Sequence, residues 1–401
     1  MGEGVGKPII VCEVEKRGIE HAVYNAALLE TVLLAYKGED VVFIAESAHV
    51  LAVRDALARA SSSHMNRIAW REIDVPQRGA GFGKVMHAEW RWCRRILQAC
   101  AANPPRLLLI CSITDSGLLV LKMMMHARRT RFPIVAVPHS VLSTLALHQS
   151  PRFWRRFVNL RQVLRLPHPR SLRYVALGRS IHRFLEEVAP KAATAFRTLD
   201  LAYFWARTRL PDPPEPNVVR FGYFGVNSLN KGFDTFFELA EEALRKTSHS
   251  EFTMVGFVRD PADCPKYAET IVGVSSTPLS GAEFARRAES LTYAVWCGNP
   301  SHYRLTASAS FLDALSYVKP GIYLRNPFIE HYFEQMGDIG HLCDTYEEML
   351  EVILALDREF PAARYRSQCE NILRGRGIFE PATLAPQLRA IVDECERPGL
   401  G

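Results

Sequence analysis

Short apolar runs alternate with longer segments of helical spacing along most of the chain, and this alternation restricts the possible folds more than any other feature. Residues 8–14 and 40–45 have the length and composition of buried parallel strands. Residues 20–36 and 48–59, which follow them, carry apolar side chains at helical spacing. Strands and helices that alternate in this way predict an α/β fold with doubly wound parallel sheets.

A proline-rich segment near the middle of the chain predicts a boundary between two domains. Residues 211–216 read Pro-Asp-Pro-Pro-Glu-Pro, which is typical of a stiff linker. The 401 residues are enough for two domains of ordinary size. We predict an N-terminal domain at 1–210, a linker at 211–217, a C-terminal domain at 218–380 and a C-terminal helix at 381–401.

The same patterns predict the remaining elements. In the first domain they give helices at 85–101, 152–165 and 179–188, a helix ending near 129, and strands at 106–112, 132–138 and 172–177, the last of this domain. In the second domain they give strands ending at 225 and spanning 251–257, 292–297 and 320–324, with helices at 231–246, 280–290, 306–317 and 344–356. Residues 79–84, Gly-Ala-Gly-Phe-Gly-Lys, lack P-loop spacing and follow no clear strand, so we expect a loop there.

The composition argues against a membrane-spanning or secreted protein. No apolar run reaches the ~18 residues that a spanning helix needs. Residues 1–7 lack the features of a signal peptide. The nine cysteines lack metal-binding spacing and are expected to be buried free thiols. We therefore expect a cytoplasmic protein.

Positive charge is concentrated in residues 116–185, which contain thirteen Lys and Arg and no Asp or Glu. Within this stretch, the predicted helix 152–165 combines an apolar stripe with arginines, a pattern typical of a helix at a membrane interface. The alternative is an ordinary helix docked on the core. We expect no nucleic-acid partner, because no basic module with interleaved aromatic residues is present. The predicted membrane contacts are Arg152, Phe153, Trp154, Arg155, Arg156 and Phe157.

Small and hydroxyl-bearing residues precede the helix predicted before Pro320. Ser308 and Ser310 lie where this helix begins, and Asp313 lies about one turn further on. Free amides and the positive end of a helix dipole suit a phosphate, and a carboxylate one turn away could bind a ribose. The alternative is an ordinary helix with a serine cap.

An upstream stretch, Phe-Gly-Tyr-Phe-Gly-Val-Asn-Ser-Leu-Asn-Lys-Gly-Phe at 221–233, has a related pattern. A strand runs into Gly225, a polar loop follows, and Lys231-Gly232 opens the next helix. Together the two stretches resemble the donor domain of GT-B glycosyltransferases, most nearly glycosyltransferase family 4. That family has a strand, a Gly, a short loop and Lys-Gly, and later a motif ending in Glu-Ala.

The resemblance implies a GT-B fold, with two Rossmann-like doubly wound domains that face a central cleft and a last helix that returns to the first domain. It implies that Lys231 grips the donor diphosphate and that Asp313 takes the place of the ribose-binding acid. The other positions in the two motifs are also expected to bind the donor: Gly225, Asn227, Tyr303, Ser308 and Ser310.

The chain departs from the family pattern at three positions. Val226 stands where the family has Arg, Leu305 stands where it has the first Glu of a pair, and Asp313 replaces the second Glu. Because Leu305 cannot hydrogen-bond a sugar, the donor sugar and the stereochemical outcome stay open.

Two loops of the first domain supply candidate catalytic residues. His139 follows the strand predicted at 132–138, and the Glu20-His21 pair follows the first strand. Ligands of open α/β sheets bind off the carboxyl ends of strands, where both loops are expected. Family 4 enzymes often carry a His near the donor sugar, and an acid beside a His could deprotonate an acceptor. The alternatives are a structural His139 and a capping pair at 20–21.

The resemblance implies a metal-independent glycosyltransferase without a cofactor, using a UDP- or GDP-linked sugar. The expected acceptor is a saccharide or lipid-linked saccharide in bacterial polysaccharide or glycolipid synthesis. The enzyme would lie peripherally at the inner face of the cytoplasmic membrane. The alternatives are a nucleotide-sugar epimerase or sugar phosphorylase of the same architecture, and a degenerate member that binds nucleotide or membrane without catalysis.

Overall fold

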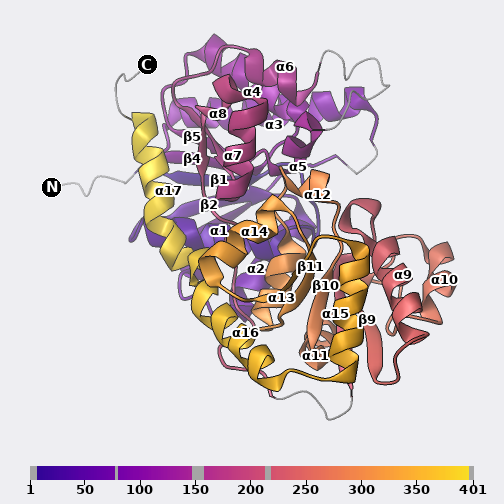
Figure 1. The fold of residues 1–401 in the computed structure, drawn as a ribbon. Helices are drawn as coiled ribbons and strands as arrows, with labels where there is room; N and C mark the ends of the chain where they lie inside the picture. Colours follow the sequence, from indigo (N-terminus) through magenta and orange to yellow (C-terminus); the bar gives the residue numbers. More distant parts are fainter. Residues whose placement is uncertain (1–6, 77–79, 147–157, 213–217, 397–401) are drawn as a thin grey trace. The chain divides into compact units, whose positions relative to one another are not determined.

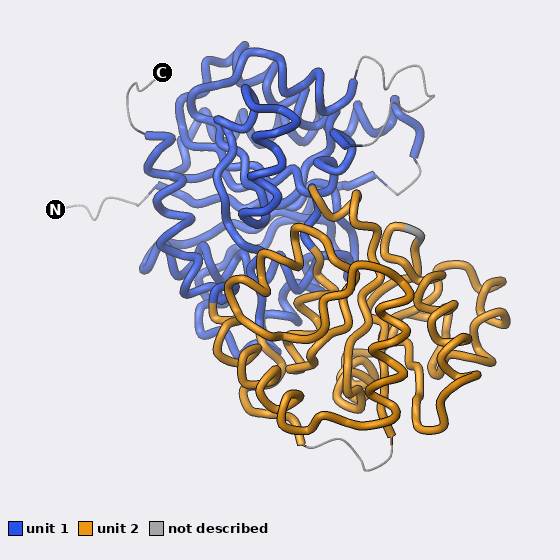
Figure 2. The backbone as a smooth tube through the Cα atoms, viewed as in Figure 1, with its two compact units in different colours: residues 1–204, 305–307, 378–401 blue, residues 205–304, 308–377 orange. Residues whose placement is uncertain are grey.

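Two parallel β-sheets, each with its own helices, make up the structure (Figures 1 and 2). The computed structural model describes residues 7–76, 80–146, 158–212 and 218–396. Unit 1 comprises residues 1–204, 305–307 and 378–401, and unit 2 comprises residues 205–304 and 308–377. Both sheets are parallel in every pair of strands, which confirms the predicted α/β class.

The sheet of unit 1 has seven strands in the order β3-β2-β1-β4-β5-β6-β7. The chain reverses its direction of travel across the sheet between β1 and β4, so this is the position where an open sheet offers a ligand crevice. All six residues of β4 are buried, as expected for a central strand covered on both faces. The strands are Ile9–Glu13 (β1), Val41–Ala45 (β2), Ile68–Glu72 (β3), Leu107–Ser112 (β4), Ile134–Ala136 (β5), Leu172–Ala176 (β6) and Phe196–Thr198 (β7).

Helices of unit 1 follow its strands in sequence, except for the last helix of the chain, α17. Helix α1 is buried on nearly every side because α2 and α17 both pack against it. The Arg389 guanidinium of α17 donates a hydrogen bond of 3.2 Å to the Ala35 carbonyl at the end of α1. The helices are Ala22–Ala35 (α1), Ser47–Arg59 (α2), Phe82–Ala102 (α3), Asp115–Arg128 (α4), His139–Leu142 (α5), Leu160–Arg165 (α6), Arg179–Val188 (α7), Pro190–Ala193 (α8) and Pro381–Glu396 (α17).

The sheet of unit 2 has five strands in the order β12-β11-β10-β8-β9. Its chain reversal lies between β8 and β10, so the loops after these two strands border the expected ligand position. The strands are Val219–Val226 (β8), Ser250–Phe257 (β9), Tyr293–Trp296 (β10), Gly321–Leu324 (β11) and Gly340–Cys343 (β12). The helices are Phe233–Leu244 (α9), Cys264–Ala268 (α10), Gly281–Ser290 (α11), Pro300–Tyr303 (α12), Ala309–Ser316 (α13), Pro327–Met336 (α14), Tyr346–Arg358 (α15) and Ala362–Gly375 (α16).

Two predictions about the strands of unit 1 are wrong. The strand at 172–177 is not the last, because β7 pairs with β6 at the edge of the sheet. A strand, β3, does precede the Gly-rich residues 79–84, and helix α3 already begins at Phe82. Only one residue of β3 and one of β7 is buried, so neither edge strand has the apolar run by which a strand is recognised in a sequence.

The single helix predicted at 152–165 is also wrong, since the helix in this region begins at Leu160. Asn159 has extended backbone angles, and its side chain accepts a hydrogen bond from the Gln162 amide, which makes it the cap of α6. Leu160 and Val163 are buried, and the ammonium of Lys122 donates to the Val163 carbonyl at 2.9 Å. The short helix α6 is therefore docked on α4.

Candidate functional site

Two glycines in unit 2 place Lys231 at the carboxyl end of β8. Gly225 has φ of 107°, and a β-carbon there would lie 3.2 Å from the Lys231 ammonium. Gly232 has φ of 70°, and a β-carbon there would lie 2.0 Å from the Cys297 carbonyl oxygen. Only glycine permits both conformations and both close approaches. The Lys231-Gly232 sequence thus brings the lysine side chain over the end of β8.

The N-terminus of α13 lies beside this lysine. A β-carbon on Gly225 would be 4.0 Å from that of Ser310, and Lys231 and Ser310 line the same small pocket. The Ser308 hydroxyl caps α13 by accepting from the Phe311 amide at 3.2 Å, and it also accepts from the Trp296 indole at 3.1 Å. An ammonium group and a helix N-terminus at one place form a suitable site for an anion.

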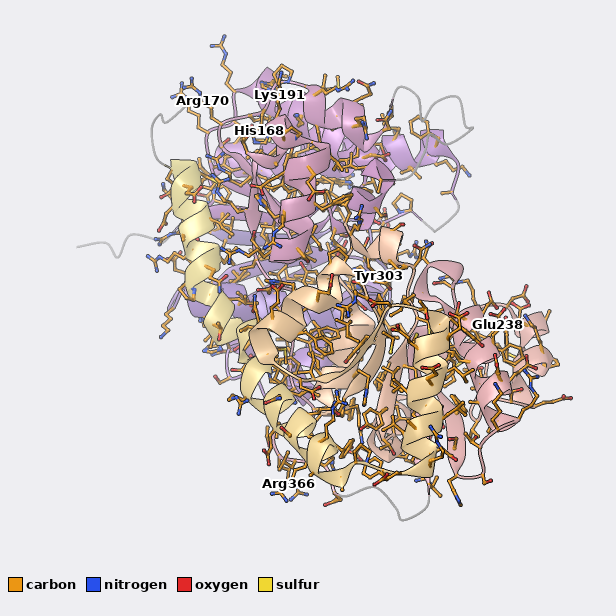
Figure 3. All side chains as sticks on the ribbon, viewed as in Figure 1. His168, Arg170, Lys191, Glu238, Tyr303 and Arg366 are labelled. Atoms are coloured by element: carbon orange, nitrogen blue, oxygen red, sulfur yellow. The ribbon has the colours of Figure 1, made fainter. Side chains whose placement is uncertain are left out.

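The other donor-binding candidates have mixed surroundings. The Asn227 side chain accepts a hydrogen bond of 2.7 Å from the Arg259 amide, so it holds the loop after β9. Tyr303, labelled in Figure 3, is buried. Its ring centre lies 4.4 Å from that of Trp296. Asp313 is half-buried in the second turn of α13. Leu305, where the family has Glu, is completely buried.

His302 is a neighbour of Lys231 that the sequence analysis did not select. Burial, and then the positive charge of Lys231, lower the pKa of His302. Its helix α12 is tied to the lysine loop because the Asn299 amide donates to the Asn230 carbonyl at 3.0 Å. The only signal in the sequence was its place soon after the strand at 292–297.

In unit 1, a buried carboxylate organises the loop that follows β1. Glu13 ends β1 and is completely buried. Its carboxylate accepts from the backbone amides of Glu15 at 2.8 Å and Lys16 at 3.0 Å, from the Asn25 amide group at 2.9 Å, and from the Ser112 hydroxyl. These bonds fix the start of the loop at the expected ligand edge.

The structure brings His21 and His139 together, although 118 residues separate them in the sequence. Nε2 of His139 lies 3.1 Å from Nδ1 of His21, which is hydrogen-bonding distance, and the ring centres are 4.9 Å apart. His21 has φ of 62°, a left-handed conformation that is uncommon for a residue other than glycine. Backbone strain of this kind is concentrated at functional sites, which favours a role for the pair.

The imidazole of His139 is neutral at pH 7. Burial, and then the nearby charge of Lys16, lower the pKa of His139 to about 4, and the carboxylate of Glu15 opposes this only partly. The hydrogen bond between the two rings contains one proton, which either ring can donate. A neutral His139 therefore donates to His21 or accepts from it, depending on which nitrogen of His139 carries its proton.

Glu15 and Lys16 are further groups beside the histidines that the sequence analysis missed. The ammonium of Lys16 lies 2.6 Å from one oxygen of Glu15, and the Ser140 hydroxyl donates to the other oxygen at 2.7 Å. Glu20, predicted as a partner of His21, instead lies 3.7 Å from Lys16. Acidic and basic residues directly after a strand, at the edge where ligands bind, were the available signal.

Glu89 is a second buried carboxyl group near this edge. It lies on α3, accepts a hydrogen bond from the Thr114 hydroxyl at the start of α4, and is 4% exposed. Burial raises the pKa of Glu89 to about 7, the hydroxyls of Ser116 and Thr114 oppose this, and the charges of Asp115 and Glu15 add to it. The folded protein therefore disfavours the ionised form.

We expect Glu89→Gln to stabilise the protein at pH 8 and to have little effect at pH 5. The pKa of Glu89 is about 7 in the folded protein, against an ordinary value of 4.5. As the pH rises between these values, the carboxyl group ionises in the unfolded chain but stays protonated in the folded protein, so the free energy of unfolding falls. Glutamine cannot ionise and avoids this loss. The gain at pH 8 should be on the order of 2–3 kcal/mol. Chemical denaturation at both pH values measures it, and an equal effect at both would contradict the assignment.

The predictions about membrane contact and metal binding concern other parts of the chain. The predicted membrane contacts, Arg152 to Phe157, lie outside the described residues. Within the described ranges, no helix has both the length and the apolar character needed to cross a membrane. The same ranges contain no group of three or more His, Cys, Asp or Glu arranged to hold a metal ion.

Comparison with known proteins supports the fold class. No protein-family model matches the chain, and no curated sequence matches it. The solved structure of Anabaena HepE in complex with UDP-glucose is similar, with a TM-score of 0.63 and 13% identity over 96% of this chain and 99% of that chain. The catalytic domain of Arabidopsis thaliana starch synthase IV, bound to ADP and acarbose, has a TM-score of 0.67 and 10% identity over 98% of this chain and 100% of that domain.

A glycosyltransferase from Rickettsia africae is also similar, with a TM-score of 0.64 and 10% identity over 98% of this chain and 100% of that chain. These likenesses show that the chain has the GT-B fold, as the sequence motifs implied. At such low identities they show the fold alone.

Proposed function

We propose that the protein is a glycosyltransferase that transfers a sugar from a nucleotide-diphosphate donor, UDP- or GDP-linked, to a saccharide or lipid-linked saccharide. The observation that carries the proposal is the position of Lys231, beside Gly225 and the N-terminus of α13, in a fold that glycosyltransferases use. Such a site can neutralise a diphosphate leaving group, as a metal ion does in other transferases. The proposed reaction therefore requires neither a metal nor a cofactor.

In this proposal unit 2 binds the donor and unit 1 binds the acceptor. His139, held neutral by its surroundings, and His21 are the candidate groups for accepting or orienting a proton of the acceptor. An epimerase of the same fold would convert its nucleotide sugar without an acceptor. Product analysis with and without acceptor distinguishes the two activities, and a lack of turnover above background would favour a non-catalytic binding protein.

The donor site is tested by thermal-shift measurements against UDP, GDP and ADP. A nucleotide that binds the native state raises the melting temperature, and a hundredfold excess over Kd corresponds to about 2.7 kcal/mol. We expect Asp313→Ala to abolish most of the shift, because this carboxylate is proposed to hold the ribose, and Asp313→Glu to retain it. An alanine variant that binds nucleotide as the wild type does would remove Asp313 from the site.

We further propose that residues 152–157 contact an anionic membrane, where the acceptor would be lipid-linked. The support is their sequence, which combines Arg152, Arg155 and Arg156 with three aromatic residues. Reversing the three arginines to Glu is expected to release the protein from vesicles of anionic lipid in a co-sedimentation assay, and high salt should do the same for the wild type. Equal pelleting of both proteins would refute the contact.

A further inference from the structure

Helix α3 has an outer face that carries positive charge along one stripe. Lys84, His87, Arg91 and Arg94 follow one another at spacings of three and four residues, and all four are exposed. This spacing places them on one side of the helix. Trp90 lies at the flank of the stripe and is 44% exposed. We call these five residues the α3 face.

The opposite side of the same helix is fixed in the core of unit 1. Trp92, Cys93, Ile96 and Leu97 are buried there, and Glu89, the acidic residue on this side, is also buried. The helix therefore presents the α3 face from a rigid base. A surface whose three cations lie on an ordered helix can bind an anionic partner without ordering the backbone first.

The cations of the α3 face lack acidic partners within the described part of the chain. No carboxylate there lies within salt-bridge distance of Lys84, Arg91 or Arg94, although other arginines of unit 1, such as Arg59 and Arg106, are paired in this way. The guanidinium of Arg94 instead lies 5.2 Å from the ring centre of Trp90. The charge of the stripe is thus available to an external anion.

We propose that the α3 face docks on an anionic lipid bilayer. Basic side chains near the headgroups, together with an exposed aromatic ring at their flank, are the combination that an interfacial helix uses. Trp90 can enter the headgroup region while Arg94, stacked on it, reaches a phosphate. The stripe is straight and lies on one rigid helix, which suits an extended planar surface.

This docking surface does not depend on sugar transfer. It acts together with the contact proposed for residues 152–157, so that loss of either set of positive charges weakens binding to anionic vesicles. Its test therefore uses binding alone. The wild type is expected to co-sediment with vesicles of phosphatidylcholine and phosphatidylglycerol and to stay in the supernatant with phosphatidylcholine alone. Each basic residue near an anionic surface contributes enough that removing three should weaken binding roughly 100-fold. The variant that tests this is Lys84→Glu, Arg91→Glu and Arg94→Glu together.

A matched variant controls for total charge. Lys37, Arg170 and Lys191 are also exposed residues of unit 1, and changing all three to Glu alters the net charge equally (Figure 3 labels Arg170 and Lys191). The proposal expects this control to bind vesicles as the wild type does, and Trp90→Ala to bind several-fold more weakly. Circular dichroism confirms that each variant is folded.

Three results would overturn the proposal. Equal co-sedimentation of the wild type and the α3-face triple variant would show that the face does not contact lipid. Equal losses in the triple variant and the control would show that only net charge matters. Binding to duplex DNA or to an acidic polypeptide that is at least as tight as binding to the vesicles, and is lost in the same variant, would assign the face to another partner.

Discussion

Replacing Lys231 with alanine is expected to lower the rate of sugar transfer by roughly 100-fold or more while the protein stays folded. The Lys231 ammonium lies over Gly225 and beside Ser310, where a departing diphosphate would gather negative charge. Removal of one such stabilising group typically costs ~10²–10³ in rate. The measurement is release of nucleoside diphosphate from the donor in the presence of acceptor.

Lys246→Ala is a suitable control, because Lys246 lies just beyond the other end of α9 and pairs with Glu242 at 2.8 Å on the surface. We expect its activity to match the wild type. Thermal denaturation should give the same midpoint for both variants, since Lys231 lies in a loop that the two glycines hold. Near-native turnover by Lys231→Ala would exclude the proposed donor site, whereas a large loss in both variants would point to a general defect.

The parts of the fold that could be predicted from the sequence are those that are buried on two faces. The central strands β1, β4, β8 and β10 are mainly apolar and were predicted within a few residues. Three strands were missed, β3, β7 and β12, and all three are edge strands. An edge strand keeps one side in solvent, so its sequence lacks a continuous apolar run.

The missed helix break at Asn159 has a different cause. Periodicity of apolar residues continues across this position, but Asn159 has extended backbone angles and its side chain accepts from the free Gln162 amide in the first turn of α6. A periodic pattern cannot distinguish one long helix from a shorter helix with its own cap. The cap residue itself was visible in the sequence and was the better signal.

The candidate site could be predicted where short local motifs supply its residues. Lys231 and Ser310 were selected from separate motifs, and the topology of the sheet brings their loops to one edge. Glu13, Glu15 and Lys16 were missed because charged residues at the end of a strand and just after it resemble a solvated loop. The carboxylates of Glu13 and Glu15 accept hydrogen bonds from Ser112 and Ser140, about 100 or more residues away, which no local pattern reveals.

The second large expected effect is a loss of activity when either histidine of the His21–His139 pair is replaced. Replacing His139 with alanine is expected to depress both sugar transfer and acceptor-free donor hydrolysis by about 100-fold, the lower range for loss of a general acid or base. For His21 the informative variant is glycine, because φ of 62° is strained for alanine and natural for glycine. We expect His21→Gly to depress transfer and to spare donor hydrolysis.

The hydrogen bond between the two rings adds a quantitative expectation. Residues that act as a unit show non-additive losses, so the double variant should transfer sugar no more slowly than the slower single variant. The acid limb of the rate should fall near pH 4, because the neutral form of His139 persists down to its lowered pKa of about 4. An acid limb near the ordinary histidine value of 6.5, or wild-type kinetics in both single variants, would show that the chemistry belongs to other residues.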